Sequence, residues 1–305
     1  MPRETVSSLN EQEFVRSALL ENTRLDSRNF DEFRPIALEY GDDYGHADVR
    51  IGKTRVLVKI SCEVVAPYVE RKFDGIFTIS TELSPIASVG FEIGRAHRSA
   101  RPDQIEMILS RLLEKTLRRS GALDTESLCI IAGKKCFSVR ADVHILDHDG
   151  NLMDASCLAL VAALLHFRRP DVEVHGEDVT VFSTSERDPV KLSMHHNPFS
   201  VTFSYYHSGS VMIQDATLLE EHCREGEITV SMNRFGEICQ IAKYGGTPVD
   251  GVRMLTCANL ALDRVKQLDK LVRERLARDD KRRNKGGLLA ELSAQNERVM
   301  EPPVG

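Results

Sequence analysis

Apolar and polar positions alternate along much of the chain, and this pattern predicts a set of antiparallel strands. Period-two alternation over Ala47–Ile51, the turn Gly52-Lys53 and the β-rich run Thr54–Val65 together predict a hairpin. A second hairpin is expected between Ile228–Asn233 and Glu237–Lys243. The other expected strands are Phe73–Ile79, Leu128–Ala132, Phe137–Leu146, Val179–Phe182, Phe199–Tyr206 and Val211–Gln214.

Apolar residues spaced three and four apart predict helices between these strands. Residues 8–22 open with a capping box, and a proline at the first helical position favours a helix over Pro102–Ser120. Met153–Phe167 is apolar on nearly every side, so this helix is expected to be deeply buried. A long last helix is expected over Val249–Arg278.

Hairpins outnumber β-α-β alternation, so the expected fold class is α+β. Mixed and antiparallel sheets should pack on central helices, with the long helix at the C-terminal end. We expect four parts along the chain: an N-terminal helix and connector at 1–30, a first half at 31–190, a second half at 191–278, and a flexible charged tail at 279–305.

The composition narrows the possible partners. The 305 residues include 40 Lys and Arg against 46 Asp and Glu, a net charge of −6. A protein that clamps duplex DNA by itself is usually strongly basic, so any nucleic-acid contact should be a local basic patch or a site shared with other chains. The seven cysteines form no C-x-x-C pair, which indicates a reducing compartment. No apolar run approaches the roughly 20 residues of a membrane span, and no signal peptide is predicted.

Basic residues gather in three places along this acidic chain. The groups are Arg95, Arg98 and Arg101; then Arg111, Lys115, Arg118 and Arg119; and last the run from Lys266 to Lys285. The first group has almost no acid nearby, and phosphate contact and plain solvation are equally open for it. For the other two groups, a solvated helix face is the favoured interpretation.

Two further clusters could carry chemistry. His195 and His196 are adjacent, so on a strand they point to opposite faces, and a shared metal ion is not expected. The segment Asp215–Glu221 holds three carboxylates, which could do acid–base work or hold a metal. The favoured interpretation is a helix N-terminus capped by Asp215, because acids in a first helical turn interact well with the helix dipole. Without further comparison, the residues show no catalytic constellation.

Several motifs, in order and with their spacing, nevertheless resemble one known family over residues 10–275. They are Arg24-Leu25-Asp26-Ser27-Arg28 with Phe33-Arg34-Pro35, then Gly45–Val56, Asp124–Ile130, Leu146–Ala155, Ala162-Ala163-Leu164, His196–Phe203 and Asp215–Glu221. Together they resemble an RNase PH-like ring subunit of the eukaryotic RNA exosome, of the type similar to the inactive partner subunit of the archaeal exosome. The resemblance implies the RNase PH-like fold, with one RNase PH-like half on each side of residue 190.

The resemblance also implies a reaction, and this chain lacks two parts of its machinery. Active members degrade RNA from the 3′ end by phosphorolysis, which requires an anion cradle and acids that hold a metal or assist proton transfer. In the family pattern the cradle follows an Asp-Gly turn with Gly, Ser or Thr, and Arg; here the residues are Asn151-Leu152-Met153-Asp154, and Asp154 adds a negative charge. The acids expected before Pro198 are replaced by Met194-His195-His196-Asn197. We therefore expect no phosphorolysis, no catalytic residue, no metal and no cofactor.

The function implied by the resemblance is a non-catalytic RNA-binding and structural subunit that threads RNA toward a separate nuclease, in rRNA maturation and mRNA turnover. The expected RNA-binding residues are Arg95, Arg98, Arg101, Arg111 and Arg118. The expected partners are RNA, other RNase PH-like ring subunits, cap subunits with RNA-binding domains and a separate catalytic exoribonuclease, in the nucleus and nucleolus and also in the cytoplasm. An active phosphate-dependent exoribonuclease is the alternative, and a small-molecule enzyme on this broad fold is a third possibility.

Overall fold

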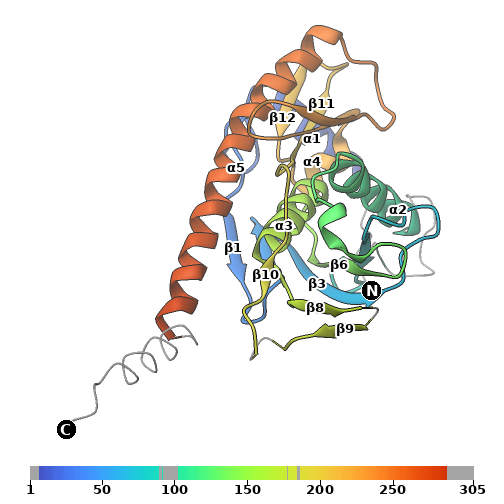
Figure 1. Ribbon diagram of the computed structural model, residues 1–305. Coiled ribbons are helices and arrows are strands. Elements are labelled where there is room, and N and C mark those ends of the chain that lie inside the picture. The colour runs from blue at the N-terminus through green and yellow to red at the C-terminus, as the bar shows by residue number, and fades with distance from the viewer. Residues whose placement is uncertain (1–6, 89–90, 92–101, 177, 184–185, 287–305) are drawn as a thin grey trace.

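The computed structural model describes residues 7–88, 91, 102–176, 178–183 and 186–286. The first half of the chain forms a six-stranded sheet in the order β1-β2-β3-β6-β4, with β5 also paired to β6 (Figure 1). Every pairing is antiparallel except β4 with β6, so the sheet is mixed. The strands are β1 (Ile36–Tyr40), β2 (His46–Ile51), β3 (Thr54–Val65), β4 (Ile76–Leu83), β5 (Cys129–Ile131) and β6 (Lys135–Asp147).

The second half forms a four-stranded antiparallel sheet in the order β12-β11-β13-β14. Its strands are β11 (Phe199–Tyr206), β12 (Val211–Gln214), β13 (Gly226–Met232) and β14 (Ile238–Ala242). Every residue of β11 is buried, because the strand is covered by helices on both faces. Two small two-stranded sheets join the halves, formed by β7 (Arg168–Arg169) with β10 (Val190–Lys191) and β8 (Val172–His175) with β9 (Asp178–Val181).

Helix α3 (Leu152–His166) lies at the centre of the molecule, between the two sheets, and contacts β2, β3 and β11. The small side chains at Ala155, Ala159 and Ala162 are fully buried and let the strands approach closely. The other helices are α1 (Leu9–Leu20), α2 (Pro102–Leu113) with its π-helical continuation η2 (Glu114–Arg119), the 3₁₀ turn η3 (Glu126–Leu128), α4 (Leu218–Cys223) and α5 (Gly251–Gly286). The predicted α+β class, mixed sheets, buried central helix and long C-terminal helix are confirmed.

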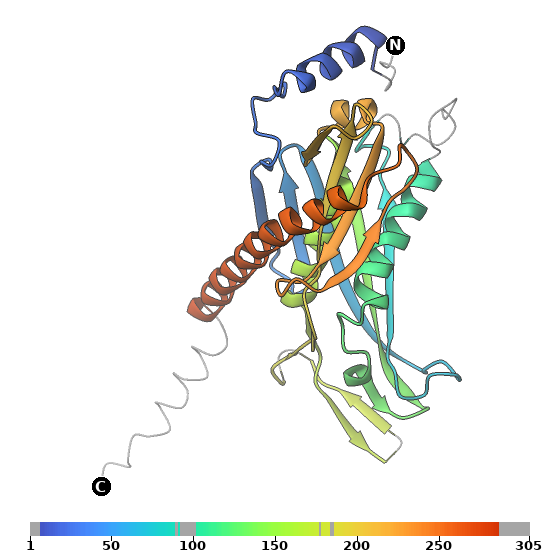
Figure 2. The same cartoon turned by 90° about the horizontal axis from the view of Figure 1, so that it is seen from above.

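The layers follow from these contacts. One hydrophobic core runs from the six-stranded sheet through α3 and the four-stranded sheet to α5. A smaller cluster holds α1 against α4, with Val15, Leu19 and Tyr206 buried. Helices α2 and α5 lie on opposite sides of the body in both views (Figures 1 and 2). No helix among the described residues combines the length and the apolar character that a membrane crossing requires.

Two predicted boundaries were wrong. The fourth strand begins at Ile76 rather than at Phe73, whose side chain is exposed in the preceding loop. Helix α5 does not end at Arg278, so residues 279–286 belong to the helix and not to a flexible tail. Tertiary contacts extend it, because the buried Asp279 lies 3.1 Å from His166 Nε2 and accepts a hydrogen bond from Arg283.

The end of α5 is held on the turn between β1 and β2. Arg283 donates to the carbonyl oxygens of Gly41 and Asp42, at 2.6 Å each. The Gly45 N–H donates to His166 Nδ1, which leaves the proton on Nε2 for Asp279. Burial is the main cause that lowers the pKa of His166 to about 4, so the ring is neutral and keeps this tautomer at neutral pH.

Candidate functional site

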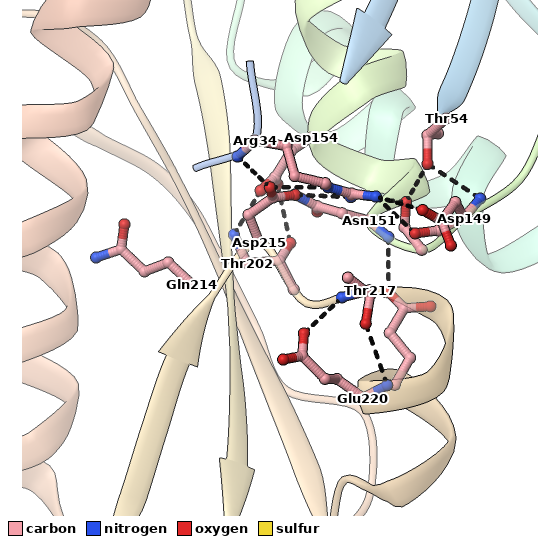
Figure 3. A network of polar contacts seen from close by, with 12 residues as sticks. Arg34, Thr54, Asp149, Asn151, Asp154, Thr202, Gln214, Asp215, Thr217 and Glu220 are labelled. Carbon is pink, nitrogen blue, oxygen red and sulfur yellow. Dashed lines mark hydrogen bonds and ion pairs between the residues drawn. The ribbon is translucent and has the colours of Figure 1, made fainter. Parts of the chain in front are cut away.

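The segment that connects β12 to α4 carries a carboxylate that no solvent reaches. Asp215 is 0% exposed and adopts a left-handed backbone conformation, with φ of 47°. Its side chain accepts hydrogen bonds from the Arg34 backbone N–H and guanidinium, from Arg28 Nη1 and from Asn151 Nδ2, all between 2.7 and 3.0 Å (Figure 3). Burial by itself raises the pKa of Asp215, but the hydrogen bonds and charge of Arg34 outweigh it and hold the pKa below its ordinary value.

The same segment holds a second buried ion pair. Arg24, 2% exposed, donates from Nε and Nη2 to the two oxygens of Glu220, at 3.0 and 2.7 Å. Its Nη1 and Nη2 also donate to the carbonyl oxygens of Gln214 and Asp215. The N-terminal connector is thus fixed to the second half of the chain by charge-assisted hydrogen bonds.

Asp215 is not the N-cap of α4, and that prediction was wrong. Thr217 caps the helix and forms a capping box with Glu220. Asp215 lies two residues earlier, because the arginines of the connector bind its carboxylate across a separation of more than 180 residues. Of the three carboxylates in this segment, Asp215 pairs with Arg28 and Arg34, and Glu220 pairs with Arg24. Glu221 lies 3.5 Å from Arg224 and also contacts the start of α3.

Glu221 belongs to α4, and its side chain reaches the start of α3, where the family pattern places the anion cradle. Its Oε1 accepts a hydrogen bond from the Asn151 backbone N–H, at 2.8 Å. Asn151 itself is in the left-handed region and its side chain points to Asp215. A carboxylate of the chain therefore occupies one of the donors that a helix N-terminus would offer to a phosphate.

Asp154 lies one turn further along α3, and its carboxyl group is also bound by another part of the chain. It is 3% exposed and accepts hydrogen bonds from the Thr202 backbone N–H and hydroxyl, both at 2.9 Å. Burial is the main cause that raises the pKa of Asp154 to about 7. The carboxyl is thus a buried group that joins α3 to β11, and not a charge exposed to a substrate, which corrects our sequence interpretation.

The turn before α3 is packed tightly against the segment that leads into α4. Gly150 has φ of +85°, and a Cβ at this position would lie 2.6 Å from the Ala216 carbonyl oxygen. The Leu218 N–H donates to the Asp149 carbonyl oxygen, and Thr54 Oγ1 donates to that of Gly150. The turn before α3 and the segment before α4 are thus in direct contact.

The adjacent histidines contact different residues. His195 is 60% exposed at its side chain and lies 3.9 Å from Asp124, whereas His196 lies 3.3 Å from Ser120. Across the described ranges, no group of three or more His, Cys, Asp or Glu side chains is arranged to hold a metal ion.

The predicted RNA-binding residues divide into two sets. Arg95, Arg98 and Arg101 lie outside the described residues. Arg111 and Arg118 are exposed on the outward face of α2 and η2. Arg118 forms an ion pair with Glu114 at 2.9 Å, whereas Arg111 forms no ion pair with the part of the chain that the structure describes. We call the exposed set Arg111, Lys115, Arg118 and Arg119 the α2 ridge.

The partners of Arg24, Arg28 and Arg34 were not predicted from the sequence. The motif containing the first two was noted only as part of a family pattern, and the acids that bind them lie about 190 residues away. One signal was present: a connector with little apolar content carries several arginines, and buried arginines require acids.

Comparisons with known proteins show which family and which solved structures the chain is similar to. Residues 32–170 match the model of the 3′ exoribonuclease family, domain 1, and residues 196–264 match domain 2. The exosome complex component rrp45 of Schizosaccharomyces pombe is 47% identical over 298 residues, which cover 98% of this chain and 100% of that protein. RRP45 of Saccharomyces cerevisiae is 41% identical over 310 residues, covering 98% and 99%. Among solved structures, an Archaeoglobus fulgidus exosome with RNA bound to the active site has a chain with a TM-score of 0.72 and 26% identity, covering 86% of this chain and 97% of that one.

Proposed function

Because the chain belongs to the 3′ exoribonuclease family, among its exosome components, we propose that it is a non-catalytic RNA-binding and structural subunit of the exosome core ring. In this role it supports 3′→5′ RNA processing and decay. The ring role is supported by 47% and 41% identity to two exosome components, in each case over 98% of this chain. The lack of catalysis is supported by the site itself.

The observation that carries the non-catalytic role is the Glu221 carboxylate at the start of α3. Phosphorolysis needs a phosphate dianion held by free donors and a cation. Here Glu221 binds the Asn151 N–H, and the next two residues, Leu152 and Met153, have neither a hydroxyl nor a charge. This carboxylate, which also pairs with Arg224 at 3.5 Å, would repel a second anion bound at the same N–H group.

RNA is held in this proposal by the α2 ridge together with Arg95, Arg98 and Arg101. Arg111 and Arg118 project from one helical face, where they can bind phosphates without reading bases. A chain with net charge −6 can still line an RNA path with local cations. The partners are then RNA, other RNase PH-like subunits, cap subunits with RNA-binding domains and a separate exoribonuclease, in the nucleus, the nucleolus and the cytoplasm.

The test of catalysis uses the full chain, alone and assembled with its ring partners, incubated with a 3′-labelled RNA and inorganic phosphate. We expect no nucleoside diphosphate above the level of the partners alone. A phosphate-dependent release of nucleoside diphosphate by this chain in the absence of its partners would assign phosphorolysis to it. That result would overturn the proposal in favour of the active alternative.

A further inference from the structure

Helix α5 presents a second basic surface that the proposed function does not use. Its outward face, which we call the α5 stripe, carries cationic side chains that are all exposed. They are Lys266, Lys270, Arg275, Arg278 and Lys281. None of them forms an ion pair with the part of the chain that the structure describes.

Three of the four acids of the same segment pair with arginines, and the fourth, Glu274, is exposed. Residues 264–283 contain nine Lys or Arg and four Asp or Glu. Asp269 is 6% exposed and binds Arg273 at 2.7 Å, and Asp279 is 8% exposed and binds Arg283. Glu274 is an exposed carboxylate within the segment and lowers the local charge by one. The outward face is therefore cationic on a chain that is acidic as a whole.

The stripe is rigid and has a defined length. Val265, Leu268 and Val272 are buried against the body, and Asp279 is fixed by His166 and Arg283. At about 1.5 Å per residue, the stripe spans roughly 22 Å from its first lysine to its last. A stretch of this length is long enough to contact several successive phosphates of an extended RNA strand. The helix would not need to change its conformation to make these contacts.

The stripe also lacks the features of a protein-docking surface. Protein interfaces depend on apolar and aromatic anchors at their centre. The exposed large apolar side chains of α5, Val252 and Leu255, precede the stripe, and none among the described residues lies within 264–283. A group of exposed cations without apolar anchors favours a phosphate backbone over an acidic protein as the partner.

We propose that the α5 stripe binds the phosphate backbone of single-stranded RNA at a site separate from the α2 ridge. Helices α5 and α2, which carry the two surfaces, lie on different sides of the body (Figure 1). RNA on the stripe therefore runs along the outer side of the subunit. The choice of RNA as the polyanion rests on the proposed function, whereas the cationic surface does not.

The test measures binding of a fluorescein-labelled single-stranded RNA to the full chain by anisotropy, as a function of salt. The stripe variant carries Lys266→Gln, Lys270→Gln, Arg278→Gln and Lys281→Gln. A matched control, also with three lysines and one arginine, carries Lys53→Gln, Lys59→Gln, Arg71→Gln and Lys72→Gln, all exposed and without ion pairs in the described structure. A third variant, Arg111→Gln with Arg118→Gln, removes charge from the α2 ridge.

We expect the stripe variant to bind at least roughly tenfold more weakly at 0.1 M salt, with the slope of log affinity against log salt reduced by about 3 for four lost contacts. The control should change neither quantity. An equal loss in the control would overturn the inference, because it would show a general charge effect. Unchanged binding in the stripe variant with weakened binding in the ridge variant would overturn it and leave the proposed function intact. Displacement of the RNA by poly-glutamate of equal charge would also overturn it, in favour of an acidic protein partner.

Discussion

The buried pair of Arg24 and Glu220 tests what holds the N-terminal connector to the second sheet. Arg24→Met removes four hydrogen bonds and leaves the Glu220 carboxylate, 3% exposed, with the Thr217 N–H as its remaining donor. Breaking one side of a buried pair costs about 3–5 kcal/mol, because the other charge stays buried without its partner. At roughly 2 °C per kcal/mol for a chain of this size, the Tm should fall by about 6–10 °C.

The assay compares thermal and urea unfolding of the full chain and its variants. The control is Arg118→Met, which breaks an exposed ion pair with Glu114 and should cost less than about 1 kcal/mol. The double variant Arg24→Met with Glu220→Leu removes both charges and should recover much of the loss. If Arg24→Met is no more destabilising than Arg118→Met, then the pair does not stabilise the connector and the reasoning is refuted.

Three further predictions follow from buried groups. The pKa of Asp154 in the folded state is raised to about 7, above its ordinary value of 3.8, so the folded state binds the proton more tightly than the unfolded state. This group therefore lowers the free energy of unfolding as pH rises from about 4 to 7. Urea unfolding of Asp154→Asn should lack this decrease, and equal pH profiles of the two proteins would contradict the prediction. The pKa of His166 is lowered to about 4, so its contribution to stability is lost as pH falls from 6.5 toward 4, and His166→Gln should lose less stability across that window in the same assay. Gly150→Ala should lower the free energy of unfolding by more than about 1 kcal/mol beyond the effect of Gly121→Ala. Both glycines have positive φ, but only at Gly150 would a Cβ lie 2.6 Å from a carbonyl oxygen. Equal Tm values for the two variants would show that the turn relaxes.

The elements that could be predicted are those whose burial follows a local period. The bounds of β3, β11 and β12 agree with the pattern: β3 alternates buried and more exposed positions from Thr54 to Ile60, and β11 is buried at every position. The role of Asp215 could not be predicted, because a carboxylate before a short helix has the same local signature whether it caps the helix or binds distant arginines. The extension of α5 depended in the same way on His166, which is 113 residues from its partner.

The N–H of Asn151 at the start of α3 is bound by a side chain of α4. Removing the Glu221 carboxylate would free one N–H, but Leu152 would still lack a hydroxyl and Met153, 8% exposed, would still lack a cation. Several positions would have to change together, and each single step would leave buried polar groups unpaired. The start of α3 therefore serves first as a junction between the two halves of the chain, because Asn151 is held by both Glu221 and Asp215.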